Sequence, residues 1–315
     1  MPWRGWACAR ARSPTEAQRR SAAVFLRRRS HRAHLVALAL VWACAGWAAA
    51  AQPGDLVVLE TEGATRPTLH AWGRSWPVRR ISAQRWRGWV GVDLTVRPGH
   101  YVAEWRFSHR RVREAIVVRP RAFALSHIRV PKAMAEFDAP TLARIRREAE
   151  AIRRCYRDWR GRAPAFRFLA LPTEGIVSTP FGARRVVNGS PRAPHKGVDI
   201  AAPRGQPVIA PLGGQVVEVL DGFLMGNTVC VAHGDGLVSV FMHLDEVKAR
   251  KGAFVRAGEI IGTVGQTGRA TGPHLHWGVV FRGAALDPLR LVANRATNAV
   301  KGADYGRKDQ ASDGD

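Results

Sequence analysis

The sequence predicts a mainly β protein with two folded parts joined by one helix. Three patterns support this: short apolar runs between turn residues over 54–120, one helical pattern near 139–156, and strands separated by glycine and proline from residue 166 onward. The chain has 315 residues, of which 46% are apolar, so it is long enough to bury two modest cores. We therefore expect two domains with a linker between them.

Residues 52–122 are expected to form a small antiparallel β-sandwich of immunoglobulin-like size. Turn residues such as Arg97-Pro-Gly separate its apolar runs, which begin at Leu56, Thr68, Trp89, Tyr101 and Val112. This part is rich in tryptophan, and we expect these side chains to fill its small core; stacking on glycan is the functional alternative. No motif in it indicates catalysis.

A linker is expected over residues 123–165, with a helix at about 139–156. Asp138 is a suitable N-cap, and Pro140 lies near the first turn, where proline is tolerated. Arginines on this helix alternate with glutamates, as on an ordinary solvated face. A ligand-binding face is the alternative interpretation.

Residues 166–294 are expected to form the second domain, built from antiparallel sheet. Its apolar runs begin at Gln215, Thr228, Val238 and Ile260. The polar residues 295–315 are expected to be a disordered tail. Cys155 and Cys230 have no metal-binding spacing, so we expect two simple core residues and predict no disulfide.

Residues 1–51 carry the features of an export signal. An arginine-rich start precedes an apolar run over 35–51 that ends in small residues, which is typical of a secretory signal peptide. An uncleaved N-terminal anchor is the alternative, because about 17 apolar residues can just span a bilayer. Both interpretations predict an exported protein of the periplasm or cell envelope.

The charge of the chain is strongly basic and unevenly spread. The formal net charge is +24, and residues 1–33 contain nine arginines and one glutamate, so +16 remains for the rest. Such a balance favours anionic surfaces, including membrane lipids, envelope polymers and nucleic acid. Because the export signal argues against nucleic acid, we expect an anionic envelope surface as the electrostatic partner and no nucleic-acid function.

Histidines and one aspartate recur at three places in the second domain. His274 and His276 are two apart in an expected strand, so their imidazoles point to one face. His195 and Asp199 lie four apart on an expected loop-to-strand segment, and His243 ends another expected strand. Two histidines and a carboxylate with an open fourth position are a known composition of hydrolytic zinc sites. The sequence therefore predicts a catalytic metal centre.

These segments resemble the three signatures of the lysostaphin/LytM-type zinc metallopeptidases. The motifs are His195-X-X-X-Asp199, Phe241-Met-His-Leu244 and Gly265-Gln-Thr-Gly-Arg-Ala-Thr-Gly-Pro-His-Leu-His276, with further matches at Thr179-Pro-Phe-Gly, Gly197-Val-Asp-Ile-Ala-Ala-Pro, Pro207-Val-Ile-Ala-Pro-Leu-Gly-Gly and Leu286-Asp-Pro-Leu. The resemblance covers roughly residues 170–291 and implies a LytM-type peptidase domain.

By this resemblance, His195, Asp199 and His276 would bind one Zn²⁺ per chain. His243 and His274 would stand beside the metal as catalytic residues suited to proton transfer. The resemblance leaves open which of these two imidazoles accepts the proton from water.

Three further points concern the surroundings of the predicted metal. Arg269 and Thr271 are expected either to contact the substrate peptide or to shape the turn before His274. Phe241 replaces the tyrosine that the family commonly has at this position, which removes a hydroxyl. Residues 184–194 lengthen the approach to His195, and we expect them to alter the groove rather than the metal site.

The resemblance implies a zinc-dependent endopeptidase that hydrolyses peptide cross-links of peptidoglycan, as a D,D-endopeptidase in cell-wall remodelling. The expected partners are the stem peptides of peptidoglycan, and a regulatory lipoprotein is left open. The alternative is a non-catalytic cell-wall-binding activator of an amidase. The complete set of ligand residues favours the enzyme.

Overall fold

A computed structural model of the chain describes residues 48–157, 161, 169–292 and 300–302. Within these residues the protein is mainly β with a single α-helix, as the sequence predicts. No helix in the described ranges is long and apolar enough to cross a membrane. The expected export signal lies outside the described residues, except for its last four positions.

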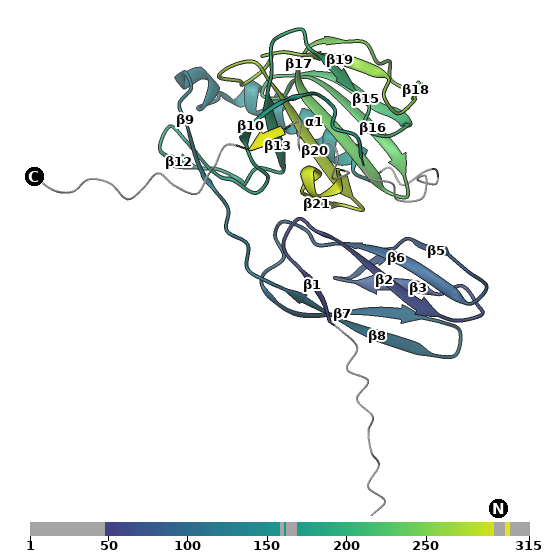
Figure 1. Cartoon of the computed structure of the whole chain (residues 1–315). Helices are drawn as coiled ribbons and strands as arrows, with labels where there is room; N and C mark the ends of the chain where they lie inside the picture. The colour runs from purple at the N-terminus through teal and green to yellow at the C-terminus, as the bar shows by residue number, and fades with distance from the viewer. Residues whose placement is uncertain (1–47, 158–160, 162–168, 293–299, 303–315) are drawn as a thin grey trace, which may run out of the picture. The chain divides into compact units, whose positions relative to one another are not determined.

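The first folded part consists of two sheets, with strand orders β1-β8-β7-β3-β4 and β2-β6-β5 (Figure 1). Its strands are β1 (Ala49–Ala51), β2 (Leu56–Glu62), β3 (Thr68–Ala71), β4 (Arg74–Trp76), β5 (Val78–Arg80), β6 (Arg85–Gly91), β7 (Gly99–Arg106) and β8 (Arg111–Val118). The sheets pack closely, because a Cβ at Gly88 of β6 would lie 2.3 Å from Leu69 of β3 and 2.8 Å from Trp105 of β7. This arrangement is a small sandwich.

The tryptophans of this part are core residues. Trp76, Trp86, Trp89 and Trp105 are buried, and Trp72 packs against the same cluster while partly exposed. The buried indole of Trp105 donates a hydrogen bond to Glu114 at 2.6 Å, so its polar atom is satisfied. Core packing therefore accounts for these side chains better than glycan stacking does.

Strand β1 was not expected, and it makes the sandwich other than purely antiparallel. It pairs in parallel with β8, with Ala49 opposite Ile116 and Ala51 opposite Val118. The three residues belong to the segment 1–51 that the sequence assigns to the export signal. A processing site that keeps this strand must therefore lie before Ala49.

The second folded part is built on one large sheet with the order β18-β15-β16-β17-β20-β13-β10-β22, to which β14, β19 and β21 also pair. The strands are β10 (Gly175–Thr179), β13 (Gly197–Ala201), β14 (Pro207–Ile209), β15 (Gly214–Gly222), β16 (Gly226–Gly234), β17 (Leu237–Val247), β18 (Phe254–Val255), β19 (Ile260–Val264), β20 (His274–Phe281), β21 (Ala284–Leu286) and β22 (Val300–Gly302). All pairs in this sheet are antiparallel except β10 with β22. Strand β22 lies within the expected tail 295–315, whose remaining residues are outside the described ranges.

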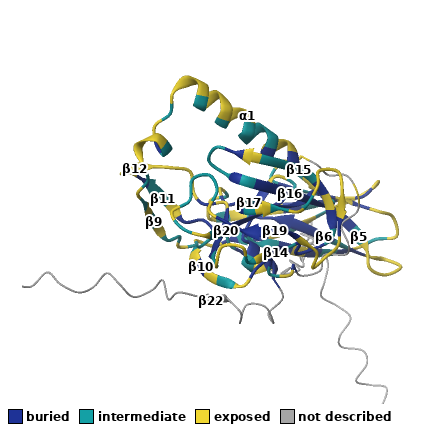
Figure 2. Cartoon of the chain, turned by 90° about the horizontal axis from the view of Figure 1, so that it is seen from above, coloured by how far each residue is buried: buried dark blue, intermediate teal, exposed yellow. Residues whose placement is uncertain are grey.

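Helix α1 (Ala139–Cys155) packs against β15 and β16 of this sheet, and its outer face is exposed (Figure 2). Asp138 caps it as predicted, since its carboxylate accepts a hydrogen bond from the Thr141 amide at 2.9 Å. Ile152 and Cys155 pack against Cys230 of β16 in a second apolar cluster. Both cysteines are buried free thiols, as expected of core residues, and the structure brings them into contact with each other.

A small third sheet connects the linker to the approach of His195. It contains β9 (Leu125–Ile128), β11 (Arg184–Val187) and β12 (Ser190–Pro191), with β9 parallel to β11. The inserted residues 184–194 thus form a hairpin, and the 3₁₀ helix η2 (Lys132–Met134) follows β9. The sequence did not predict this pairing, which determines what surrounds the candidate site.

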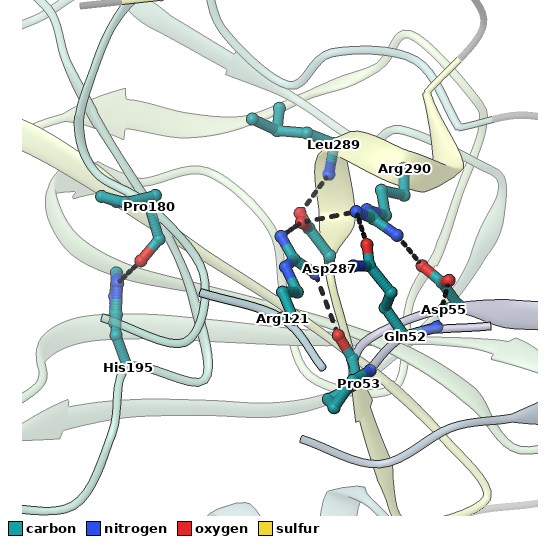
Figure 3. A network of polar contacts seen from close by, with 9 residues as sticks. All are labelled: Gln52, Pro53, Asp55, Arg121, Pro180, His195, Asp287, Leu289 and Arg290. Atoms are coloured by element: carbon teal, nitrogen blue, oxygen red, sulfur yellow. Dashed lines mark hydrogen bonds and ion pairs between the residues drawn. The ribbon is translucent and has the colours of Figure 1, made fainter. Parts of the chain in front are cut away.

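The sandwich and the large sheet are in contact. Asp287, before the 3₁₀ helix η3 (Pro288–Leu291), pairs with Arg121, while Arg290 pairs with Asp55. Figure 3 shows these side chains pointing toward one another. The buried apolar residues of the sandwich and of the large sheet also form a single cluster. The domain boundaries predicted from the sequence remain a proposal, and the folding of an isolated fragment tests them.

Candidate metal centre

Two neighbouring strands and the loop before one of them hold the predicted ligand residues. Asp199 of β13 lies directly opposite His276 of β20 in the antiparallel register. His195 precedes β13, which begins at Gly197, so the predicted loop-to-strand placement is confirmed. Residues 81 positions apart in the chain meet here because β13 and β20 are neighbours.

The side chains of His195, Asp199 and His276 converge on one point. Nε2 of His195 lies 2.8 Å from Nδ1 of His276 and 2.9 Å from Oδ1 of Asp199, and Nδ1 of His276 lies 2.8 Å from the same oxygen. All three residues are buried. Among the residues described, this is the group of histidine, cysteine and acidic side chains that could hold a metal ion.

The orientation of His195 is fixed by a backbone carbonyl. Its Nδ1 lies 3.1 Å from the oxygen of Pro180 (Figure 3). A carbonyl oxygen can only accept, so Nδ1 carries the hydrogen and Nε2 keeps its lone pair. This is the arrangement in which metal-binding imidazoles are usually held.

The three converging atoms cannot all be paired by hydrogen bonds, because too few hydrogens lie between them. Nδ1 of His276 can donate to either His195 or Asp199 but not to both, and neutral His195 has no hydrogen on Nε2. The lone pairs of His195 Nε2 and Asp199 Oδ1 therefore face each other at 2.9 Å, whichever of the two His276 donates to. A cation removes this repulsion, and zinc ligands at about 2.0–2.1 Å from the metal would themselves be about 3.3 Å apart. The donor set fits a zinc ion with small adjustments.

Asp199 is held as a carboxylate. Burial alone would raise its pKa, but the neighbouring imidazoles of His195 and His276 hold the pKa well below its usual value. Its second oxygen accepts a hydrogen bond from Arg185 of β11 at 3.0 Å. The sequence analysis did not identify Arg185; the signal that could have found it is the arginine-rich insertion just before His195.

Gly197 lets the two strands and the His276 ring come close. A Cβ at this position would lie 2.5 Å from the Trp277 carbonyl oxygen and 2.9 Å from the ring atoms Cε1 and Nε2 of His276. Any side chain here would displace the imidazole, so the glycine between His195 and Asp199 has a steric reason.

His243 and His274 lie beside this group, with their ring centres 4.7 Å apart. Nδ1 of His243 donates to the Thr267 carbonyl and Nδ1 of His274 to the Gly272 carbonyl, each at 2.8 Å. Neither Nε2 has a hydrogen-bond partner in the part of the chain that the structure describes. Both rings can therefore present a lone pair toward a substrate.

His243 marks the point where β17 changes partner. The strand pairs with β20 up to Met242 and with β19 from Leu244. Between them His243 adopts a φ of 64°, in the left-handed region that non-glycine residues rarely use. The strand does not end at this histidine as expected; it continues to Val247. The switch turns the imidazole toward His274.

The electrostatic surroundings keep two of the imidazoles neutral at pH 7. Burial lowers the pKa of His243 to about 3, with a further contribution from His274. Burial also lowers the pKa of His276 to about 4, against the opposing effect of Asp199. Neutral imidazoles keep the lone pairs needed to bind a metal or accept a proton.

The residues expected to contact substrate lie at the turn before β20. Arg269 donates from its backbone amide to Leu224 at 2.9 Å and from its guanidinium to the Met134 carbonyl at 3.3 Å. Thr271 is exposed in the same turn. Phe241 is fully buried in the core, so the ring that replaces the family tyrosine does not face the solvent side of the site.

Comparisons with known proteins find relatives of this chain. A profile described as "Peptidase family M23" matches residues 193–288. A crystal structure of a peptidase M23 from Pseudomonas aeruginosa aligns with a TM-score of 0.62 and 33% identity, over 76% of this chain and 94% of that chain.

Two curated relatives match part of the chain. The peptidoglycan DD-endopeptidase ShyA of Vibrio cholerae is 34% identical over 138 residues, covering 44% of this chain and 32% of that protein. The murein hydrolase activator NlpD of Escherichia coli is 36% identical over 127 residues, covering 39% and 31%. The chain thus spans about a third of the length of these relatives.

Proposed function

Because the chain belongs to peptidase family M23, we propose that it is a zinc-dependent endopeptidase that hydrolyses the peptide cross-links of peptidoglycan. The observation that carries this proposal is the convergence of His195, Asp199 and His276 beside two imidazoles with free Nε2 atoms. The similarity to a peptidoglycan DD-endopeptidase supports D,D-endopeptidase activity as the specific reaction.

In this proposal His195, Asp199 and His276 hold one Zn²⁺. When bound, the ion supplies a polarised scissile carbonyl and a water of lowered pKa. Asp199 contributes the negative charge of the ligand set, and its low pKa keeps that charge at any physiological pH. Pro180 keeps the His195 lone pair directed at the site.

His243 and His274 carry the proton transfers. Because each Nδ1 donates to a carbonyl, each Nε2 is an acceptor in the neutral ring. One ring takes a proton from the attacking water; the other, once protonated, stabilises the tetrahedral oxyanion or protonates the leaving amine. The two rings are close enough to contact the same reacting group, and their division of labour is left open.

The second candidate function is that of a non-catalytic activator of a cell-wall amidase, which the similarity to NlpD favours. An activator needs no convergent donor set and no free imidazole pair. This chain keeps both, so the enzyme is the better supported function.

We further propose that the protein is exported and acts in the cell envelope. The arginine-rich start and the apolar run over 35–51 support export, and the basic charge suits an anionic envelope surface. Stem peptides are the proposed substrate partner. A pull-down from envelope extracts tests whether a regulatory lipoprotein also binds.

A defined cross-linked muropeptide dimer tests the proposed function. The purified chain loaded with zinc should convert the dimer to monomers, and a chelator should stop the reaction until zinc is restored. Arg146→Gln, on the exposed face of α1, is a matched control that should cleave at the wild-type rate. A dimer that stays intact with zinc-loaded protein contradicts the enzyme and favours the activator.

A further inference from the structure

Three arginines gather beside the candidate metal centre. Arg185 lies on β11, Arg192 follows β12, and Arg269 lies in the turn before β20. The guanidinium groups of Arg192 and Arg269 donate to successive carbonyls, those of Ala135 and Met134, each at 3.3 Å. The end of η2 therefore holds these two side chains together. We call the three residues the arginine cluster.

The arginine cluster adjoins the metal ligands through one carboxylate. Oδ1 of Asp199 faces His195 and His276, whereas Oδ2 accepts from Arg185 at 3.0 Å. The cluster thus begins one carboxylate group away from the point where the metal donors converge. A substrate bound at that point would therefore lie next to Arg185, whose charge acts on the neighbouring Arg269.

The positive charge of the cluster is not balanced by the chain itself. Asp199 is shared with the metal donors, and no carboxylate pairs with Arg192 or Arg269 within the described residues. Burial lowers the pKa of Arg269, and the charges of Arg185 and Arg192 lower it further. Nε of Arg185 is buried without a hydrogen-bond partner. Like charges held together beside an unsatisfied donor are stabilised by a bound anion.

An ordinary solvated basic face is the alternative for a chain with 49 lysines and arginines. Such a face has exposed, separate side chains. Here Arg185 and Arg269 are partly buried, and the guanidiniums of Arg269 and of the exposed Arg192 are held by backbone carbonyls. The fixed, crowded arrangement favours a binding site over a solvated face.

We propose that the arginine cluster binds a free carboxylate of the substrate peptide next to the bond that is cut. This inference rests on the proposed function and deepens it, because it assigns an acidic peptide as the substrate class. Guanidinium groups match carboxylates with paired, charge-assisted hydrogen bonds. A peptide in which that carboxylate is converted to an amide keeps its shape and loses the charge, so it binds poorly.

Binding of two matched peptides tests this inference separately from cleavage. The probes are two uncross-linked stem peptides that differ in one side chain only, which carries either a free carboxylate or a carboxamide. Calorimetry on the full-length, zinc-loaded protein should give a Kd about tenfold or more lower for the acid, as expected for hydrogen bonds to a charged group. In Arg192→Gln and Arg269→Gln the two Kd values should become nearly equal, with zinc content unchanged.

The control variant is Arg146→Gln, which removes the same charge from an exposed position on α1. It should keep the preference for the acid. Equal binding of the two peptides by the wild type, absence of binding of both, or an equal loss in the control overturns the inference. Cleavage of a cross-linked dimer without acid preference refutes only the arginine cluster, whereas acid preference without cleavage refutes only the proposed enzyme.

Discussion

Acidification provides a quantitative test of the packing of the large sheet, through His233 of β16. Its imidazole is buried, Nδ1 donates to the Gly213 carbonyl at 3.1 Å, and Nε2 accepts from the Ser239 hydroxyl at 2.9 Å. Burial lowers the pKa of His233 from 6.5 to about 4, although the carbonyls of Gly213 and Leu212 oppose this. The ring is therefore neutral in the folded protein at pH 7.

The sign and size of the effect follow from this pKa. Since the unfolded chain binds the proton near pH 6.5 and the folded protein only near pH 4, acidification between these values favours unfolding. The stability that depends on neutral His233 is complete above pH 6.5 and is lost as the pH falls. By pH 4.5 the loss amounts to about 2.5 kcal/mol, at about 1.4 kcal/mol per pKa unit.

Urea unfolding from pH 7.5 to pH 4.5 measures this loss in the wild type and in His233→Asn. The variant is expected to be less stable at pH 7.5, because it loses packing and a hydrogen bond, but its stability should fall less steeply with acid. Other titrating groups contribute equally to both proteins and cancel in the difference. Parallel curves over the whole range would refute a buried neutral His233.

Other expectations concern the metal, the catalytic imidazoles and the architecture. Asp199→Ala should lose most of the bound zinc, whereas His243→Ala should keep it while turnover falls about 10²–10⁴-fold; metal analysis with rate measurements separates the two outcomes. Gly268→Ala places a Cβ 2.3 Å from neighbouring backbone at a φ of 70°, so it should lower the free energy of unfolding by about 1–3 kcal/mol. It should also reduce activity by moving the adjacent Thr267 carbonyl, which holds His243; a variant with the melting temperature and rate of the wild type contradicts this. A fragment of residues 166–294 should fold, bind zinc and melt at a lower temperature than the full chain, because it loses apolar cover; complete insolubility means that the two parts form one inseparable core.

The sequence predicted the elements whose signal is local. Strand β19 begins at the predicted residue Ile260, and α1 begins after the predicted cap Asp138. Alternation of apolar residues, turn residues and capping groups act within a few positions, so they can be recognised without knowledge of the fold. The mainly β fold and the single helix could therefore be predicted.

The elements that the sequence missed depend on distant partners. Strand β1 is three alanines at the end of an apolar run, and it becomes a strand by pairing with β8 far along the chain. Strands β9 and β11 form a parallel pair between the linker and the insertion at 184–194. No local pattern specifies such pairs, because register between remote segments is set by packing in the folded state.

The candidate site was likewise predicted where the signal is local and missed where it depends on distant segments. The motifs identified His195, Asp199 and His276, which the structure brings together; their role as ligands stays a proposal that metal analysis tests. Arg185 and Arg192 were missed because their places beside the site are set by the hairpin β11–β12 and by its contacts with the linker. In the sequence they belong to a chain in which arginine is common.

The central claim is that this protein cuts peptide cross-links by itself. The most direct measurement is the ratio of cross-linked dimers to monomers in purified sacculi after incubation with the zinc-loaded chain, once a separate enzyme has cleaved the glycan strands. The account predicts fewer dimers, more monomers and new free amines, with uncut glycan before the second enzyme is added. It also predicts that the His276→Ala variant leaves the ratio of dimers to monomers in the sacculi unchanged. An unchanged ratio with the wild-type chain, together with increased release of stem peptides when an amidase is added, contradicts the endopeptidase and establishes the activator instead.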